Sequence, residues 1–158
     1  MRIFSAFIFA GFTVLFFLTI CIADSAISEE GGAYVGAAAC GKCHEEQFNN
    51  YMRYSKKSKS FESIRKMKKG LTDSEVIQCY ECHTTGYGES TGFKSESETP
   101  DLKNAGCEVC HGPGGRHAES GDATLIKSHL TIDDCIKCHN SERIDSFNIK
   151  PLVFGGAH

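Results

Sequence analysis

The stretch Cys107-Glu108-Val109-Cys110-His111 is one of four copies of the same C-x-x-C-H pentad in this sequence. The others are Cys40-Gly41-Lys42-Cys43-His44, Cys79-Tyr80-Glu81-Cys82-His83 and Cys135-Ile136-Lys137-Cys138-His139. This pentad is the attachment signature of a c-type haem, because two thiols at this spacing can add to the two vinyl groups of one porphyrin. The histidine that follows supplies an imidazole to the iron as its proximal ligand. Four pentads therefore predict four covalently attached haems.

Cysteine pairs at C-x-x-C spacing also build zinc sites, and in oxidising compartments cysteines form disulfides. The histidine directly after the second cysteine of every pentad argues against both alternatives. The pentads use eight of the nine cysteines and leave only Cys21. The predicted haem-attaching residues are Cys40, Cys43, Cys79, Cys82, Cys107, Cys110, Cys135 and Cys138, and the predicted proximal ligands are His44, His83, His111 and His139.

Residues 1–23 have the pattern of a secretory signal peptide. Arg2 precedes an apolar run without charges over residues 3–20, and Cys21-Ile22-Ala23 offers a cleavage site. The alternative is a retained membrane anchor, since the run is near the lower length for spanning a bilayer. No basic stop-transfer cluster follows, so we expect cleavage, no membrane span afterwards, and a periplasmic or extracellular protein.

Residues 24–158 are expected to form a single domain of about 135 residues. Four haems leave roughly 34 residues for each, which is too few for an ordinary side-chain core. The porphyrins are therefore expected to form most of the core. The fold class that follows is mainly α with extensive loops and little β, a small multihaem cytochrome c wrapped around four covalent haems. Without its haems the chain is expected to be largely unfolded.

Aromatic and aliphatic side chains recur at helical spacings between Phe48 and Leu71, and Gly70 is a plausible helix end. The remaining positions of this segment are strongly basic, which is usually a solvated helix face. The alternative is a docking patch for an acidic redox partner. Binding to nucleic acid is not expected of a secreted chain packed with haem.

Glycine, proline and polar residues predict a loop or short hairpin over residues 84–106, with Tyr87 and Phe93 as anchors against a haem. The next stretch, His111-Gly112-Pro113-Gly114-Gly115-Arg116-His117, permits a tight turn and a close backbone approach to a porphyrin. This turn directs His117 away from its own haem and toward another. We therefore predict that His117 is an iron ligand rather than an exposed surface histidine.

The second and third pentads carry a wider pattern. Gly86-Tyr87-Gly88 follows the second pentad, and the third reads Gly106-Cys107-Glu108-Val109-Cys110-His111-Gly112-Pro113-Gly114. Together they resemble the tetrahaem cytochrome c-554 family and related multihaem cytochromes of the hydroxylamine-oxidising group. The tail from Cys138 to His158 resembles the family's last-haem segment. The resemblance implies a mainly helical fold, haems stacked in closely spaced pairs, and electron transfer as the role. Some family members keep one five-coordinate haem.

By this resemblance, His117 serves the first haem and His158 the fourth. His129 either caps the second haem or lies on the surface. The family usually has a histidine on the first helix, and Lys57 occupies that position in this sequence. By the resemblance, the haem that lacks this histidine ligand is the third. Lys57 has three possible fates: a solvated ammonium that leaves the iron open, a neutral amine that ligates the iron, or a partner of a propionate while another histidine ligates.

The predicted function is single-electron transfer between redox proteins, either other cytochromes or a membrane oxidoreductase. The protein would supply haem spacing, axial ligands and local dielectric rather than covalent chemistry. One alternative is a haem enzyme that reduces a small nitrogen oxide or peroxide at an open iron, but no catalytic acid or base stands out near a pentad. The other alternative is a subunit of an extracellular cytochrome filament, which would require self-association.

Overall fold

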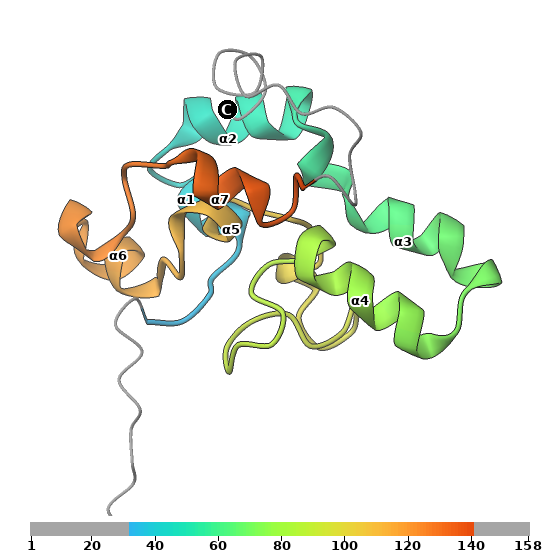
Figure 1. The fold of residues 1–158 in the computed structure, drawn as a ribbon. Coiled ribbons are helices and arrows are strands. Elements are labelled where there is room, and N and C mark those ends of the chain that lie inside the picture. The colour runs from blue at the N-terminus through green and yellow to red at the C-terminus, as the bar shows by residue number, and fades with distance from the viewer. Residues whose placement is uncertain (1–31, 141–158) are drawn as a thin grey trace, which may run out of the picture.

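The computed structural model describes residues 32–140, and helices joined by loops make up this part of the chain (Figure 1). The α-helices are α1 (Ala37–Cys40), α2 (Glu45–Tyr54), α3 (Phe61–Met67), α4 (Asp73–His83), α5 (Glu108–His111), α6 (Gly115–Ser120) and α7 (Ile132–Ile136). The 3-10 helices are η1 (Lys56–Lys59), η2 (Lys68–Gly70), η3 (Pro100–Leu102) and η4 (Ala123–Leu125). No strand occurs within residues 32–140, which confirms the mainly α fold. The predicted signal peptide and His158 lie outside the described residues.

Each pentad forms one helical turn. In the first, third and fourth pentads, the backbone N–H of the histidine donates to the carbonyl of the first cysteine, at 2.9, 3.1 and 2.9 Å. The second pentad lies inside α4, whose start is fixed by a capping box between Thr72 and Glu75. Residues three and four apart lie on the same side of a helix. One helical turn therefore presents both thiols and the following imidazole to the same region of space.

The basic segment is not the continuous helix that its periodicity predicts. Helix α2 ends at Ser55, whose backbone is extended (φ −82°, ψ 125°), and η1 and α3 follow as separate pieces. The Ser55 hydroxyl accepts from the backbone N–H of Lys57 and thereby caps η1. The break changes which side chains share a face, since Tyr54 is 61% exposed while Phe61 is buried. Gly70, the predicted stop, does end η2.

A side-chain core lies between α3, α4 and the loop over residues 84–106. Phe93 is 1% exposed and packs with its ring centroid 5.8 Å from that of Phe61 and 5.2 Å from that of Tyr80. Ile64, Val76 and Leu102 complete the buried cluster. Phe93 thus anchors the loop against the side chains of α3 and α4. This small cluster is the side-chain core found within residues 32–140, and packing of Phe93 or Tyr87 against a haem stays a prediction.

The loop over residues 84–106 is held to the core by backbone hydrogen bonds at Thr85. The N–H of Thr85 donates to the carbonyl of Leu102 at 2.8 Å, and its carbonyl accepts from Phe93 at 2.9 Å. The Thr85 hydroxyl donates to the carbonyl of Asn104 and accepts from the N–H of Gly106, which leads into the third pentad. The loop therefore fixes where the third pentad begins.

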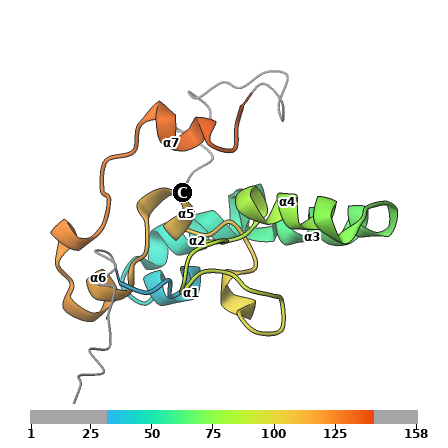
Figure 2. The same cartoon turned by 60° about the horizontal axis from the view of Figure 1, so that its bottom comes forward.

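Helices α3 and α4 lie side by side at one end of the molecule, and the other helices gather at the opposite end (Figures 1 and 2). An extended stretch after α6 leads to α7 and the fourth pentad (Figure 2). Within residues 32–140, no helix has the length and apolar character needed to cross a bilayer.

Candidate haem-binding sites

The eight pentad cysteines are free thiols, and two pairs of them hydrogen-bond between different pentads. Cys40 and Cys107 hydrogen-bond to each other, which lowers the pKa of Cys40 to about 7 against the opposing effects of burial and of the Glu108 charge. Burial, followed by a hydrogen bond with Cys82, raises the pKa of Cys138 to about 12. The first pentad thus adjoins the third, and the second adjoins the fourth.

Electrostatic interactions between thiols link these two pairs of pentads. Burial raises the pKa of Cys110, and smaller effects on it come from the charge of Lys57 and from Cys135 in the fourth pentad. The charge of Cys110 in turn raises the pKa of Cys138. The four pentads therefore follow one another in space in the order first, third, fourth, second, which differs from their order in the sequence.

Three predicted iron ligands have their imidazoles oriented by backbone carbonyls. The Nδ1 atoms of His83, His111 and His117 lie 2.9, 2.6 and 2.9 Å from the carbonyl oxygens of Ser60, Lys127 and Asp122. A metal-bound histidine usually donates its second ring N–H to such an acceptor, which fixes the tautomer and the ring orientation. In His83 and His117 this arrangement leaves Nε2 as the nitrogen that would face an iron.

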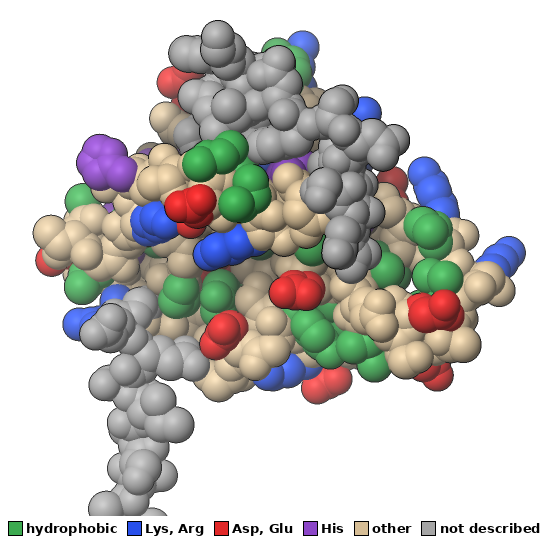
Figure 3. Space-filling model, viewed as in Figure 1, with side chains coloured by type: hydrophobic (Ala, Val, Ile, Leu, Met, Phe, Trp, Pro, Cys, Tyr) green, Lys and Arg blue, Asp and Glu red, His purple; other side chains and the backbone are tan. Residues whose placement is uncertain are grey.

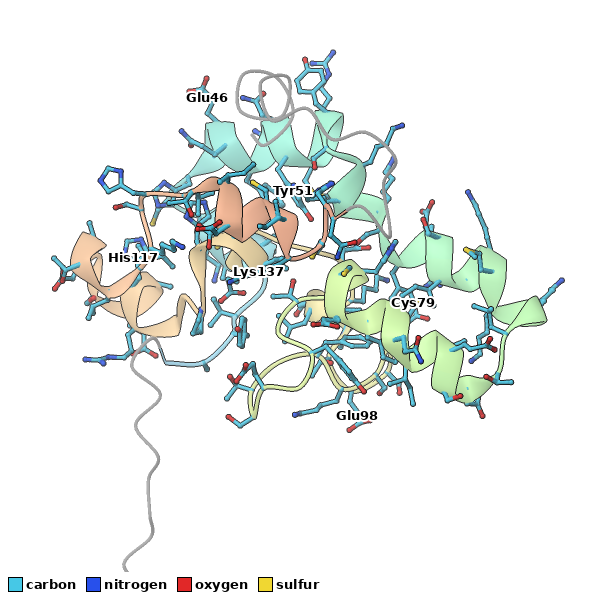
Figure 4. The ribbon with its side chains drawn as sticks, in the orientation of Figure 1. Glu46, Tyr51, Cys79, Glu98, His117 and Lys137 are labelled. Atoms are coloured by element: carbon cyan, nitrogen blue, oxygen red, sulfur yellow. The ribbon has the colours of Figure 1, made fainter. Side chains whose placement is uncertain are left out.

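The imidazole rings of His44 and His117 lie close together and nearly parallel. Their ring centroids are 6.1 Å apart and their planes differ by 24°. With metal–nitrogen bonds of about 2 Å, two imidazoles that held the same iron would have centroids about 6 Å apart, so His44 and His117 could together hold one haem. His117 comes from α6, and Figure 4 labels it beside that helix. The tight turn predicted at residues 112–115 thus does bring His117 to a different pentad.

Glycine is required at two places in that turn. Gly112 ends α5 with φ +79°, a conformation that other residues adopt only with strain. A Cβ atom on Gly115 would lie 2.8 Å from the carbonyl oxygen of Ala33, because the N-terminal segment crosses the turn at that point. The N–H of Gly115 donates to the same carbonyl at 2.9 Å. The turn and residues 32–36 therefore fit only with no side chain between them.

Glu108 is a site residue that the sequence did not reveal. It occupies a variable position of the third pentad, yet only 2% of it is exposed. Its carboxylate accepts from the backbone N–H of Val35 at 3.0 Å, and from those of Gly36 and Gly114 at 2.8 Å. Gly36 precedes α1 and the first pentad, while Gly114 precedes α6 and His117. One carboxylate therefore joins the first pentad, the third pentad and the turn before His117.

The remaining ligand candidates are less fully defined by the structure. His129 is exposed, and His158 lies outside the described residues. Lys57 is half-buried, and its charge acts on both Cys110 and His139. Burial first, and Lys57 second, lower the pKa of His139, which favours the neutral imidazole that an iron requires. Lys57 thus acts electrostatically on both the third and the fourth pentads.

These observations fit covalent haem. The pentad thiols form no disulfides, and each helical turn presents cysteine and histidine side chains together. Backbone carbonyls orient three of the imidazoles through Nδ1. Within residues 32–140, no group of three or more His, Cys, Asp or Glu side chains is arranged to hold a bare metal ion.

Comparison with known proteins gives three matches. The family model described as "Cytochrome c554 and c-prime" matches residues 39–112, which include the first three pentads. Cytochrome c-554 of Nitrosomonas europaea is 32% identical over an alignment of 105 residues, and the match covers 57% of this chain and 44% of that protein. The match therefore spans less than half the length of the curated relative.

The structure of reduced cytochrome c554 from Nitrosomonas europaea superposes with a TM-score of 0.59 and 24% identity, over 80% of this chain and 85% of that one. At this identity the superposition shows a shared fold. The three matches together confirm the resemblance to the cytochrome c-554 family that the pentads and the turn indicated.

Proposed function

We propose, on the premise that this chain is a cytochrome of the c-554 family, that it carries four covalent haems and passes single electrons between redox proteins. The observation that carries the proposal is the His44–His117 ring pair, whose separation of 6.1 Å suits two imidazoles on one iron. Haem iron held by two imidazoles changes oxidation state with little rearrangement, which suits electron transfer better than binding of a substrate.

The eight pentad cysteines would hold the four haems, and His44, His83, His111 and His139 would be their proximal ligands. His117 would be the sixth ligand of the first haem. The chain's own contribution is orientation: the carbonyls of Ser60, Lys127 and Asp122 each hold the Nδ1 proton of one imidazole. Such an acceptor raises the basicity of the ligand and prevents the ring from rotating.

His158 would be the sixth ligand of the fourth haem and His129 of the second. Lys57 lies beside the third and fourth pentads, where its charge reaches both. The sites would exchange electrons in the order first, third, fourth, second, because the first and third pentads and the second and fourth are joined by thiol hydrogen bonds, and the thiols of the third and fourth act on each other electrostatically. Residues 1–23 would direct secretion and be removed, so that the protein acts in the periplasm or outside the cell.

The partner would be an acidic redox protein that docks on the basic face, defined as Arg53, Lys56, Lys59, Arg65, Lys66, Lys68 and Lys69. All seven residues are exposed, although the chain as a whole has a net charge of −3. In Figure 3, Lys and Arg side chains (blue) project around α3. Ser60, within this segment, binds His83 through its carbonyl at 2.9 Å and through its hydroxyl, which donates to the His83 carbonyl at 2.8 Å. The basic face therefore adjoins the second haem site.

Reversing two charges on the basic face is expected to slow electron transfer to an anionic oxidant. Ferricyanide is the probe, and its second-order rate constant with the reduced protein is measured by stopped flow at increasing ionic strength. The variant Lys66→Glu/Lys68→Glu should react several-fold more slowly than wild type at low salt, because a positive surface concentrates anions near the second site. The difference should vanish at high salt.

The matched control for this charge reversal is Lys94→Glu/Lys103→Glu, which makes the same change in net charge on the loop over residues 84–106. If both double variants slow the reaction equally, net charge alone acts and the basic face is not an entry site.

The haem content itself is directly measurable. The purified protein should exceed the mass of the processed polypeptide by four haems, and the haem should stay with the protein through acid–organic extraction because thioether bonds hold it. Each Cys-to-Ser double variant of one pentad should lower the mass by one haem. Extractable haem, or zinc in its place, would contradict the proposal.

A further inference from the structure

The side chain of Glu108 joins two chain segments that lead to the two histidines of the first haem site. One segment leads through α1 to His44, and the other leads into α6, which carries His117. We propose that Glu108, a residue of the third pentad, is the positioning residue for the sixth ligand of the first haem, and that it holds His117 opposite His44. The inference rests on the proposed function, because it concerns a haem that the first pentad would hold.

The two oxygens of Glu108 bind different segments. Oε1 accepts from the backbone N–H of Gly114 at 2.8 Å, and Oε2 accepts from that of Gly36 at 2.8 Å. The N–H of Val35 reaches both oxygens, at 3.0 Å from Oε1 and 3.2 Å from Oε2. Glu108 is 2% exposed, so little water competes for these contacts. The side chain therefore joins the two segments only while both of its oxygens accept hydrogen bonds.

Gly36 and Gly114 are the N-cap residues of α1 and α6, and neither of these helices has a side-chain cap. In a capping box, an acidic side chain inside the helix accepts from the N–H of the N-cap residue, as Glu75 does from Thr72 at 2.8 Å in α4. Glu108 makes the same contact with two helices and belongs to neither. One side chain therefore fixes the start of α1 relative to the start of α6.

The two imidazoles follow the helices that Glu108 places. In α6, the Nδ1 atom of His117 lies 2.9 Å from the carbonyl oxygen of Asp122, and the N–H of Gly121 donates to the His117 carbonyl at 2.7 Å. After α1, the N–H of His44 donates to the carbonyl of Cys40 at 2.9 Å. A shift of either helix start therefore moves one ring of a pair whose centroids are 6.1 Å apart.

The test replaces Glu108 with glutamine in the complete, haem-loaded protein. Glutamine keeps one acceptor oxygen, but its NH2 group would lie against the N–H of either Gly36 or Gly114, which releases that segment. The number of high-spin haems should rise by one in four relative to wild type, measured by electron paramagnetic resonance. The reduced protein should bind additional carbon monoxide at that haem, while its mass still shows four attached haems.

Two further measurements separate positioning from a general loss of structure. Added imidazole should return the new high-spin haem of Glu108→Gln to low-spin, because the site lacks only its sixth ligand. The double variant Glu108→Gln/His117→Ala should have the same number of high-spin haems as His117→Ala alone, because both changes act on one ligand. A failure of imidazole to restore the low-spin signal, or an additional high-spin haem in the double variant, would overturn the proposal.

The matched control is Glu119→Gln, the same replacement at an exposed position of α6, which should leave every spin state as in wild type. If Glu108→Gln does not assemble, Gly115→Ala decides. A Cβ atom on Gly115 would lie 2.8 Å from the carbonyl oxygen of Ala33, so it forces the turn away from the N-terminal segment while the Glu108 side chain stays in place. This variant should produce the same high-spin haem, and added imidazole should restore it to low-spin.

Unchanged spin states in an assembled Glu108→Gln, or in Gly115→Ala where it decides, would overturn the proposal, as would an equal effect in Glu119→Gln. A wild-type protein with fewer than four haems, or an unchanged spectrum in His117→Ala, would instead contradict the proposed function, because the first haem or its sixth ligand would then be missing. The two failures are therefore distinguishable.

Discussion

Replacing His117 with alanine is expected to convert one haem from low-spin to high-spin and to open its iron to carbon monoxide. The physical reason is the geometry of the His44–His117 pair, whose centroid separation of 6.1 Å leaves room for one iron between two imidazoles. With the His117 ring removed, His44 remains as the only axial ligand from this pair. The high-spin fraction should rise by one haem in four relative to wild type, measured by electron paramagnetic resonance and by the visible spectrum of the reduced protein.

The matched control for this substitution is Glu119→Ala, an exposed change in the same helix α6. This variant should leave the spin state of every haem as it is in wild type. An unchanged spectrum in His117→Ala would remove this residue from the ligand set and would leave the ring pair without a role. A second variant, His117→Met, offers a thioether in place of the imidazole and should restore a low-spin haem at a more positive potential.

The largest effect on stability is expected from Phe93→Ala. Phe93 is 1% exposed and packs between Phe61 and Tyr80, so truncation leaves a cavity at the centre of the only side-chain cluster found within residues 32–140. Removal of a buried aromatic ring typically lowers the free energy of unfolding by about 3–5 kcal/mol. The measurement is guanidinium unfolding followed by far-ultraviolet circular dichroism, with the haems still attached through their thioether bonds.

Tyr54→Ala is the control for Phe93→Ala. Tyr54 is 61% exposed, so this loss of an aromatic ring should change stability by only about 0.5 kcal/mol or less. Equal losses in the two variants would mean that the haems, rather than the Phe93 cluster, hold α3 and α4 together. The expectation of a core built mostly from porphyrin would then be correct for the whole chain.

The sequence by itself predicted the haem attachment sites and the helical character of the chain, and the structure confirms the helical character. Both follow from local chemistry: two thiols and an imidazole within one helical turn need no distant partner to be recognised. The turn at residues 112–115 was also readable, because its glycines and proline favour a tight turn, and the structure shows Gly112 with a positive φ. The same turn led to the prediction that His117 is an iron ligand.

Only the tertiary structure decided which pentads meet and which charges lie between them. The pairing of Cys40 with Cys107 and of Cys82 with Cys138 depends on contacts across long stretches of chain, and no spacing in the sequence encodes these contacts. Glu108 looked like a variable pentad residue until the fold placed Val35, Gly36 and Gly114 around its carboxylate. The break at Ser55 was equally invisible, because a helical period persists in the sequence even where one residue turns extended. Local patterns specify chemistry and helix, whereas burial of a charge and the order of sites in space arise from packing between distant segments.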